Sequence, residues 1–275
     1  MKTISLRVSA SLKQLRLIGW SASILSATVL SAVAGAGTWN GSTSTDWNTA
    51  ANWAGGVPSG GNATITSTNP RIATITGTIS GTPVDILIGT GAALTGRVDH
   101  ISGNAFTGNG NWMWMGYQGG NATYNLCDTT TGGGTFTGYG QGSGSLTVGG
   151  NSTSSGNILA ALDAGTTATF NMNSSGTLSI AQFFVLGDNG GGAATLNLDH
   201  GTVLVTNELR VGGSYFGSGT QGYLNMSGGS INADIITVSR GNNNGSTVTG
   251  NALLTGGTLT SRRWFTMGFA GTSAA

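Results

Sequence analysis

The stretch Leu196-Asn197-Leu198, followed by Gly201-Thr202-Val203 and closed by Val211-Gly212, decides the fold of this chain. Its first part, apolar–Asn–apolar, occurs in full at Tyr124-Asn125-Leu126, Phe170-Asn171-Met172, Leu196-Asn197-Leu198 and Leu224-Asn225-Met226, and in degenerate form at Ala252-Leu253-Leu254. The Asn positions of the last three full copies are 171, 197 and 225, so successive copies are about 27 residues apart. A repeat of this length, built from short alternating strands and Gly turns, is typical of a solenoid in which each repeat forms one coil.

Alternation along a strand places Phe170 and Met172 on one face and Asn171 on the other. Equivalent strands stacked at ~4.8 Å bring like residues into columns, apolar inside and Asn outside as an amide ladder. We therefore expect Leu198, Met226 and Leu254 to lie in a row. The sequence predicts an all-β, right-handed parallel β-helix (β-solenoid), with coils of ~25–29 residues and about eight coils in all.

Residues 1–34 have the pattern of a secretory signal peptide. Lys2, Arg7, Lys13 and Arg16 precede an apolar stretch over residues 17–33, and Ala32-Val33-Ala34 offers small residues at a cleavage site. A membrane anchor is the alternative interpretation, but Ser and Thr dilute the apolar stretch. We expect cleavage and therefore a secreted chain.

Removal of residues 1–34 leaves six arginines, no lysine and nine acidic residues, a formal net charge of −3. A mildly acidic surface without lysine argues against nucleic acid or anionic lipid as a partner. The single cysteine, Cys127, excludes an intramolecular disulfide, and we expect it to be a small, half-buried strand residue.

Two further segments follow the signal. Residues 35–62 are rich in Trp, with Trp39, Trp47 and Trp53, and are expected to form an N-terminal cap over the first coil. Residues 63–275 are expected to form the β-helix. Its last repeat has no such cover, which indicates either a fragment truncated at its C-terminus or a missing further module.

The head of the expected mature chain carries a second pattern: Trp39-Asn40-Gly41, Asp46-Trp47, Asn52-Trp53 and Gly55-Gly56-Val57-Pro58. Together with the repeats, it resembles the Gly-rich, autotransporter-like β-helix surface proteins of planctomycete and verrucomicrobial bacteria, which often end in a PEP-CTERM-type sorting signal. The family's usual Asp before the first strand is replaced near Asn62. The resemblance implies an extracellular β-helix and specifies no biochemical activity. The sorting signal is absent here, so membrane association is expected only through a missing C-terminal module.

Candidate catalytic residues are few. Glycoside hydrolysis needs two carboxylates about 5–10 Å apart, and Asp163 and Asp188 are spaced by about one coil, but both stand in Gly or Asn settings typical of turns. His100 and His200 lack partners at metal-ligand spacing and are read as turn or surface histidines. We expect no catalytic residue, no cofactor and no metal site.

Aromatic residues give the strongest alternative. Trp112 and Trp114 alternate with Met113 and Met115, so the two Trp side chains share one strand face, and Tyr117 follows. Outward rings could stack on sugars while Asn side chains bind hydroxyl groups. The other reading is that one face fills the core and the other lies beneath a loop. Arg262-Arg263-Trp264 is read as an outer corner with Trp264 as a core anchor.

The sequence as a whole predicts a non-enzymatic structural β-solenoid, secreted or on the surface of a Gram-negative-type bacterium and potentially adhesive. Expected partners are extracellular polysaccharide or other surface proteins. The alternative function is a carbohydrate-binding or carbohydrate-active β-helix that uses exposed Trp and Asn. Its glycan contacts would be Trp112, Trp114 and Tyr117.

Overall fold

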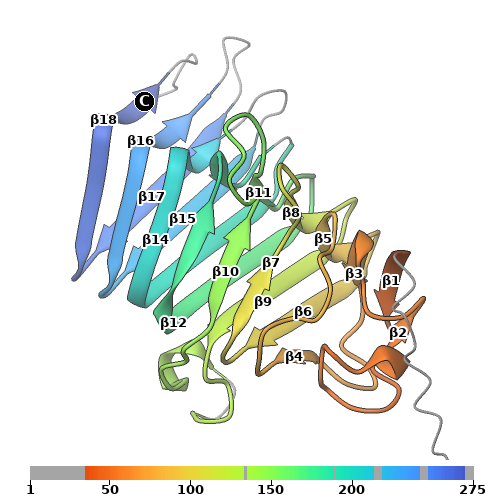
Figure 1. The fold of residues 1–275 in the computed structure, drawn as a ribbon. Coiled ribbons are helices and arrows are strands. Elements are labelled where there is room, and N and C mark those ends of the chain that lie inside the picture. The colour runs from red at the N-terminus through yellow and green to blue at the C-terminus, as the bar shows by residue number, and fades with distance from the viewer. Residues whose placement is uncertain (1–34, 133–134, 189, 214–218, 242–246, 270–275) are drawn as a thin grey trace, which may run out of the picture. The chain divides into compact units, whose positions relative to one another are not determined.

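Parallel strands stack directly on one another from coil to coil in the computed structural model of the protein (Figure 1). The structure describes residues 35–132, 135–188, 190–213, 219–241 and 247–269. Strands account for 58% of the described residues and helix for 3%, and the coils form about eight stacked turns. The predicted all-β parallel β-helix is therefore confirmed.

The strand pairings fall into three columns, which we call the first, second and third faces. The first face contains β4 (Ala73–Ile75), β6 (Thr95–His100), β9 (Asn121–Cys127), β15 (Thr220–Met226), β17 (Val248–Leu254) and the first parts of β12 (Thr167–Ile180) and β14 (Ala193–Gly213). The second face contains β7 (Asn104–Phe106), β10 (Ser145–Val148), the second part of β12, the middle of β14 and the first parts of β16 (Ser230–Arg240) and β18 (Thr258–Phe269).

The third face completes each coil. It contains β1 (Gly35–Trp39), β3 (Gly60–Ile65), β5 (Ile86–Thr90), β8 (Met113–Tyr117), β11 (Ile158–Ala160), β13 (Phe183–Leu186) and the last parts of β14, β16 and β18. β2 (Trp53–Ala54) pairs antiparallel with β1, and two short 3-10 helices, η1 (Ala50–Asn52) and η2 (Phe136–Gly138), lie outside the three faces.

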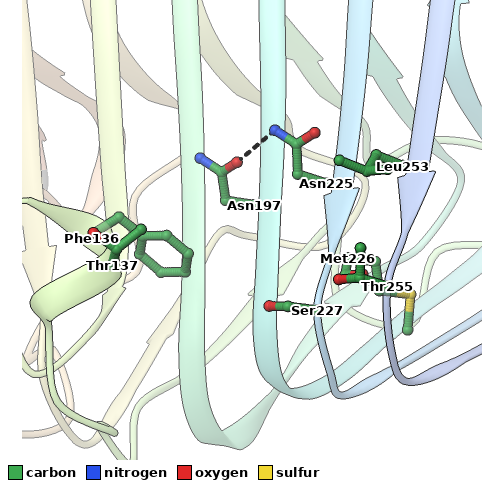
Figure 2. A pocket seen from close by; sticks show the side chains of 8 residues that line it. All are labelled: Phe136, Thr137, Asn197, Asn225, Met226, Ser227, Leu253 and Thr255. Atoms are coloured by element: carbon green, nitrogen blue, oxygen red, sulfur yellow. Dashed lines mark hydrogen bonds between the residues drawn. The ribbon is translucent and has the colours of Figure 1, made fainter.

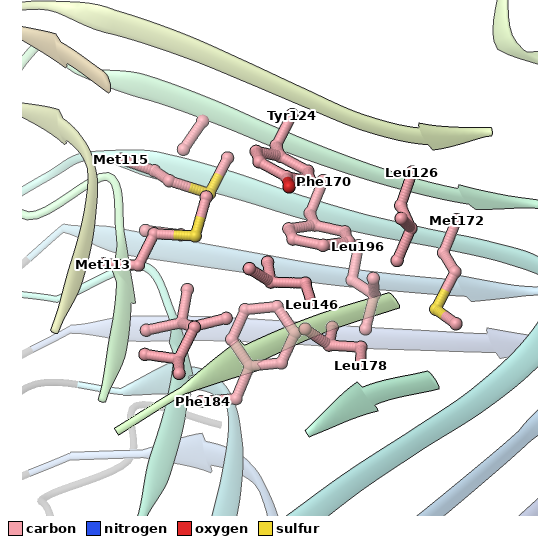
Figure 3. Close-up of a cluster of buried hydrophobic side chains, with 14 of the residues drawn as sticks. Met113, Met115, Tyr124, Leu126, Leu146, Phe170, Met172, Leu178, Phe184 and Leu196 are labelled. Carbon is pink, nitrogen blue, oxygen red and sulfur yellow. The ribbon is translucent and has the colours of Figure 1, made fainter. Parts of the chain in front are cut away.

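Apolar side chains from the three faces meet inside the coils and stack on their equivalents in the next coil. Leu198 is paired with Met226, and Met226 with Leu254, which confirms the predicted row. Tyr124 and Phe170 lie one above the other, with their rings stacked at a centroid distance of 5.1 Å (Figure 3). The core is therefore continuous along the stack, and each coil depends on its neighbours for burial of its apolar residues.

The same columns continue into β17 and β18, where the side chains are exposed. Leu254, Phe265 and Met267, which follow Met226, Ile236 and Val238 in register, are 46%, 50% and 73% exposed. Trp264 is 61% exposed, so the expectation that it anchors the core is wrong. It follows the outward residue Ile235 in register, and alternation keeps it on the outer side of the strand.

The Trp-rich segment forms a tight cluster next to the first coil. Trp47 and Trp53 meet edge to face at 4.7 Å, and Trp39 and Trp53 meet at 5.1 Å. Asn52 is fully buried and accepts hydrogen bonds from the backbone N–H groups of Thr43 and Ser44. β1, within this segment, already pairs in parallel with β3, so the third face begins inside residues 35–62.

One coil is longer than the expected ~25–29 residues. Asn125 and Asn171 occupy equivalent places but are 46 residues apart, whereas later equivalents are 26 and 28 apart. The extra residues form two insertions, one between β9 and β10 and one between β10 and β11. The stacked strands keep their register because both insertions fall at corners between faces.

The apolar–Gly ending of each repeat is a corner of the coil. Gly89, Gly116, Gly187 and Gly212 have φ between 60° and 75°, a conformation that L side chains rarely adopt. A Cβ placed on Gly187 would lie 2.5 Å from the backbone oxygen of Gln221 in the next coil. Glycine is required here both by the backbone conformation and by the close approach of the neighbouring coil.

Gly187→Ala should therefore lower the free energy of unfolding by at least about 2 kcal/mol, since it combines left-handed strain with a backbone clash. Gly165→Ala, at φ 73° in open space, should cost about 1 kcal/mol. Gly77→Ala, with neither strain nor close neighbours, is the control and should change little. Chemical denaturation of the three variants measures this order, and equal effects for Gly187→Ala and Gly165→Ala would contradict the role given to coil contact.

Candidate functional site

The predicted aromatic row, which begins at Trp112 and continues along β8, lies on the outer side of the third face. Met113 and Met115 are fully buried inside the coil, while Trp112, Trp114 and Tyr117 are partly exposed. The Trp112 and Trp114 rings are stacked at 5.1 Å, and the Trp114 and Tyr117 rings are tilted at 5.4 Å. The alternation inferred from sequence is thus confirmed, and the three rings form one contiguous strip.

The strip is held by contacts with neighbouring coils. Trp112 Nε1 donates a 2.7 Å hydrogen bond to Ser155 Oγ, and Trp112 N donates to Asp85 Oδ1 at 2.8 Å. Trp114 lies between Leu87 and Leu159 in the strand register. These contacts fix the rings in place and leave part of each ring accessible.

A second outward feature, the Asn ladder, runs along the first face. Each Asn donates from Nδ2 to the side-chain oxygen of the preceding coil: Asn125 to Asp99 at 2.7 Å, Asn171 to Asn125 at 2.7 Å, Asn197 to Asn171 at 2.7 Å and Asn225 to Asn197 at 2.9 Å. The predicted amide ladder is confirmed. All these bonds point the same way along the stack, so the amide dipoles reinforce one another.

The ladder begins at a carboxylate. Asp99 accepts two hydrogen bonds from the Arg97 guanidinium, at 2.8 and 3.0 Å, in addition to the one from Asn125. Thr129 Oγ1 adds a fourth hydrogen bond at 3.2 Å.

Close by, the thiol of Cys127 is fully buried rather than half-buried, because its side chain is enclosed next to the ladder. Burial, with a further contribution from the Asp99 charge, raises the pKa of Cys127 to about 12, so the thiol is unreactive at neutral pH.

The first insertion covers the start of the ladder. Its ends meet through reciprocal backbone hydrogen bonds between Asp128 and Gly140. Tyr139 is buried; its hydroxyl accepts from Arg97 Nη2 at 3.1 Å and its backbone oxygen accepts from Asn173 Nδ2 at 3.2 Å. Asn125 and Asn171 are consequently buried, whereas Asn197 is half-buried and Asn225 is exposed.

A groove of about 270 Å³ lies where this cover stops. It is lined by Phe136, Thr137, Asn197, Asn225, Met226, Ser227, Leu253 and Thr255. Figure 2 shows Phe136 and Thr137 of η2 on one side, with the two Asn side chains and Leu253 following on successive strands. No pattern in the sequence marks this groove.

The acidic residues make structural contacts. Asp163 Oδ2 accepts from the backbone N–H of Gln118 at 2.7 Å, and Asp188 is buried. Glu208, also buried, contacts the Arg210 guanidinium at 2.9 Å, Thr237 Oγ1 at 2.8 Å and the Arg240 guanidinium. Asp163 and Asp188 thus lie at coil corners, as their turn-like settings suggested. In the part of the chain that the structure describes, no three His, Cys, Asp or Glu side chains gather as a metal site would require.

His100 is a core residue, which corrects the expectation of a turn or surface position. It is paired with Leu126 in register, so its side chain points into the coil. Its Nδ1 lies 2.8 Å from the Tyr124 hydroxyl and its Nε2 lies 3.1 Å from the backbone oxygen of Gly103. Desolvation by burial lowers the pKa of His100 from its ordinary 6.5 to about 4, with backbone contacts to Gly103 and Ser102 opposing the shift. His200, in contrast, is exposed as expected.

Comparison of the chain with family models, with characterised proteins and with solved structures finds no match. Within the described residues, no helix has the length and apolar character needed to cross a bilayer.

Two features of the sequence indicate the core position of His100, the start of the ladder at Asp99 and the insertions. Val98-Asp99-His100 stands one repeat before Tyr124-Asn125-Leu126 and is a divergent copy of the same phrase. As a copy of that phrase, it predicts that His100 points into the coil and that Asp99 is the first residue of the Asn ladder. The gap of 46 residues between Asn125 and Asn171 likewise signals an insertion.

Burial of neutral His100 makes stability depend on pH. Between pH 6.5 and about 4 the unfolded state binds a proton at this residue and the folded state does not, so the free energy of unfolding should fall as pH decreases through this window. The total loss from His100 should be about 3 kcal/mol. Urea unfolding across this range measures it.

His100→Gln is the matched control, since Gln can still bond the Tyr124 hydroxyl but does not titrate. The variant should show a shallower dependence than the parent chain, because the acidic residues titrate in both. Identical pH profiles for the two proteins would show that His100 is not buried in its neutral form.

Proposed function

We propose that the protein is a secreted or cell-surface structural β-solenoid without catalytic activity. The observation that carries the proposal is the Asn ladder. Four amide–oxygen bonds of 2.7 to 2.9 Å tie five coils together outside the core. These polar side chains bind one coil to the next. Such a use of polar groups favours a structural function over a catalytic one.

The carboxylates support the same proposal. Asp99 and Glu208 are each buried beneath several donors, among them an arginine on the same strand. A general acid or nucleophile must reach the substrate, whereas these groups serve neighbouring side chains. Extracellular placement rests on the signal-like residues 1–34 and on the resemblance to autotransporter-like surface proteins.

A second candidate function is carbohydrate binding through the aromatic strip. The specific observation in its favour is that Trp112, Trp114 and Tyr117 form a partly exposed row with centroid spacings of 5.1 and 5.4 Å. Aromatic faces of this kind stack on the apolar faces of sugars, and a row could follow a chain of them. An adhesive protein that grips extracellular polysaccharide would combine both functions.

Expression of the full chain in a Gram-negative host tests the first proposal. The protein should be recovered outside the cytoplasm, with Gly35 as its first residue. The double variant Ala32→Leu and Ala34→Leu removes both small residues at the cleavage site and should remain unprocessed. The recovered protein should release no new reducing ends from a panel of polysaccharides. Retention of the unprocessed parent chain in the cytoplasm, or steady polysaccharide cleavage, would contradict the proposal.

A further inference from the structure

The groove beside η2 combines three kinds of surface. Phe136 presents a half-buried aromatic ring from the first insertion. Asn197 and Asn225 present side-chain amides from adjacent coils, and Ser227, Thr137 and Thr255 present hydroxyl groups (Figure 2). Leu253 closes the far side with an exposed apolar side chain.

The Asn ladder ends inside this groove. Asn225 uses Nδ2 to bond Asn197 Oδ1, and the next position in the column is Leu253, which has no donor to offer. Within the described part of the chain, no donor bonds Asn225 Oδ1. Since the amides below it are aligned in one direction, this oxygen is a stronger hydrogen-bond acceptor than an isolated amide. The ladder thus presents a polarised acceptor to whatever enters the groove.

Charge restricts the ligand. None of the eight side chains described as lining the groove is charged. Asp199 accepts a 2.8 Å hydrogen bond from the lining residue Ser227 through its Oγ, so a negative charge lies next to the rim. An anionic ligand would meet this charge without a cation in the lining. A cationic ligand would meet only the exposed, solvated Asp199 carboxylate, which adds little to binding. The groove therefore suits a neutral ligand.

Size and backbone access restrict it further. A volume of about 270 Å³ is slightly below the ~300 Å³ at which drug-sized ligand pockets begin, so the groove holds one ring-sized unit. A peptide strand would need an open sheet edge for main-chain pairing. Asn197 and Asn225 lie on β14 and β15, which are paired on both sides, whereas Leu253 lies on β17, which among the described residues pairs only with β15. The polar part of the groove therefore offers side chains and no strand edge. An aromatic ring beside amides and hydroxyls matches a hydroxyl-rich ring with an apolar C–H face.

We infer that this groove is a binding site for one residue of a neutral oligosaccharide. Phe136 stacks on the apolar face of the sugar, Asn225 Oδ1 accepts from a sugar hydroxyl, and Asn197 and Ser227 supply further polar contacts. The site is separate from the aromatic strip of the third face, and it adds a binding activity to the structural role proposed above.

Nuclear magnetic resonance titration of the full chain tests the inference. The probes are hexasaccharides of glucose (α1,4 and β1,4 linked), mannose, xylose and N-acetylglucosamine at millimolar concentration, with oligogalacturonate as a charged comparison. At least one neutral probe should shift the side-chain amide signals of Asn197 and Asn225, and oligogalacturonate should not. Phe136→Ala should weaken that binding about tenfold or more.

Leu253→Asn is the sharper variant. It adds a donor next to Asn225 Oδ1 and extends the ladder by one rung, so binding should be lost while stability is kept or raised. This result separates a lost site from a damaged fold. Trp264→Ala, at an exposed aromatic residue on the third face, is the matched control and should leave binding unchanged.

Three results would overturn the inference. They are no shift with any neutral probe, unchanged binding in both Phe136→Ala and Leu253→Asn, and equal shifts with a neutral tetrapeptide. Loss of sugar binding in Trp114→Ala, with Phe136→Ala unaffected, would assign the glycan to the aromatic strip instead. None of these results alters the structural proposal, which is judged by processing and by the absence of cleavage.

Discussion

In-register stacking of equivalent residues in successive coils is the constraint on which the rest of this structure depends. A parallel strand pairs each residue with its own counterpart one coil away, as Leu196 with Leu224 and Asn197 with Asn225. Each inward apolar residue then packs on the equivalent residue of the next coil, and each ladder Asn bonds the Asn of the next coil. Both contacts join different coils, so a single coil lacks them and the fold is stable only as a stack.

The corners follow from the same constraint. Strands can lie at ~4.8 Å only if each coil turns at the same place. Glycines such as Gly187 allow that turn because they accept a positive φ and leave room for the next coil. Where extra residues are needed for another purpose, they are inserted at corners. The insertion carrying Phe136 and Tyr139 covers the buried rungs of the ladder and ends beside the exposed ones.

The repeated phrase predicted the columns and the ladder, and the Trp–Met alternation predicted that Trp112 and Trp114 share one strand face. Alternation and register are local properties that sequence spacing records. It could not predict the groove. The place of Phe136 over the first face is set by where the insertion folds back, through Tyr139 and Arg97, and no period encodes such contacts. His100 was misplaced for another reason. A histidine stands where the other repeats have an apolar residue, so Val98-Asp99-His100 does not match the repeated phrase by residue type. Its spacing from Leu126, with which it pairs, still follows the repeat. Trp264 was misplaced because it was placed in the core on the ground that it is aromatic. Its register partner in the preceding coil, Ile235, faces outward, and this indicates that Trp264 does so too.

Oxidative cross-linking measures the register directly. Cysteines at positions 197 and 225 should have Cα atoms about 4.8 Å apart and side chains on the same side, within the range that a disulfide spans. Cysteines at 197 and 223 should be about 8 Å apart, which a disulfide cannot bridge without movement of the backbone. The buried Cys127 thiol should not compete. In-register stacking predicts rapid, complete cross-linking of the Asn197→Cys, Asn225→Cys pair and little cross-linking of the Asn197→Cys, Tyr223→Cys pair. Equal or reversed yields would show that the coils do not stack in register.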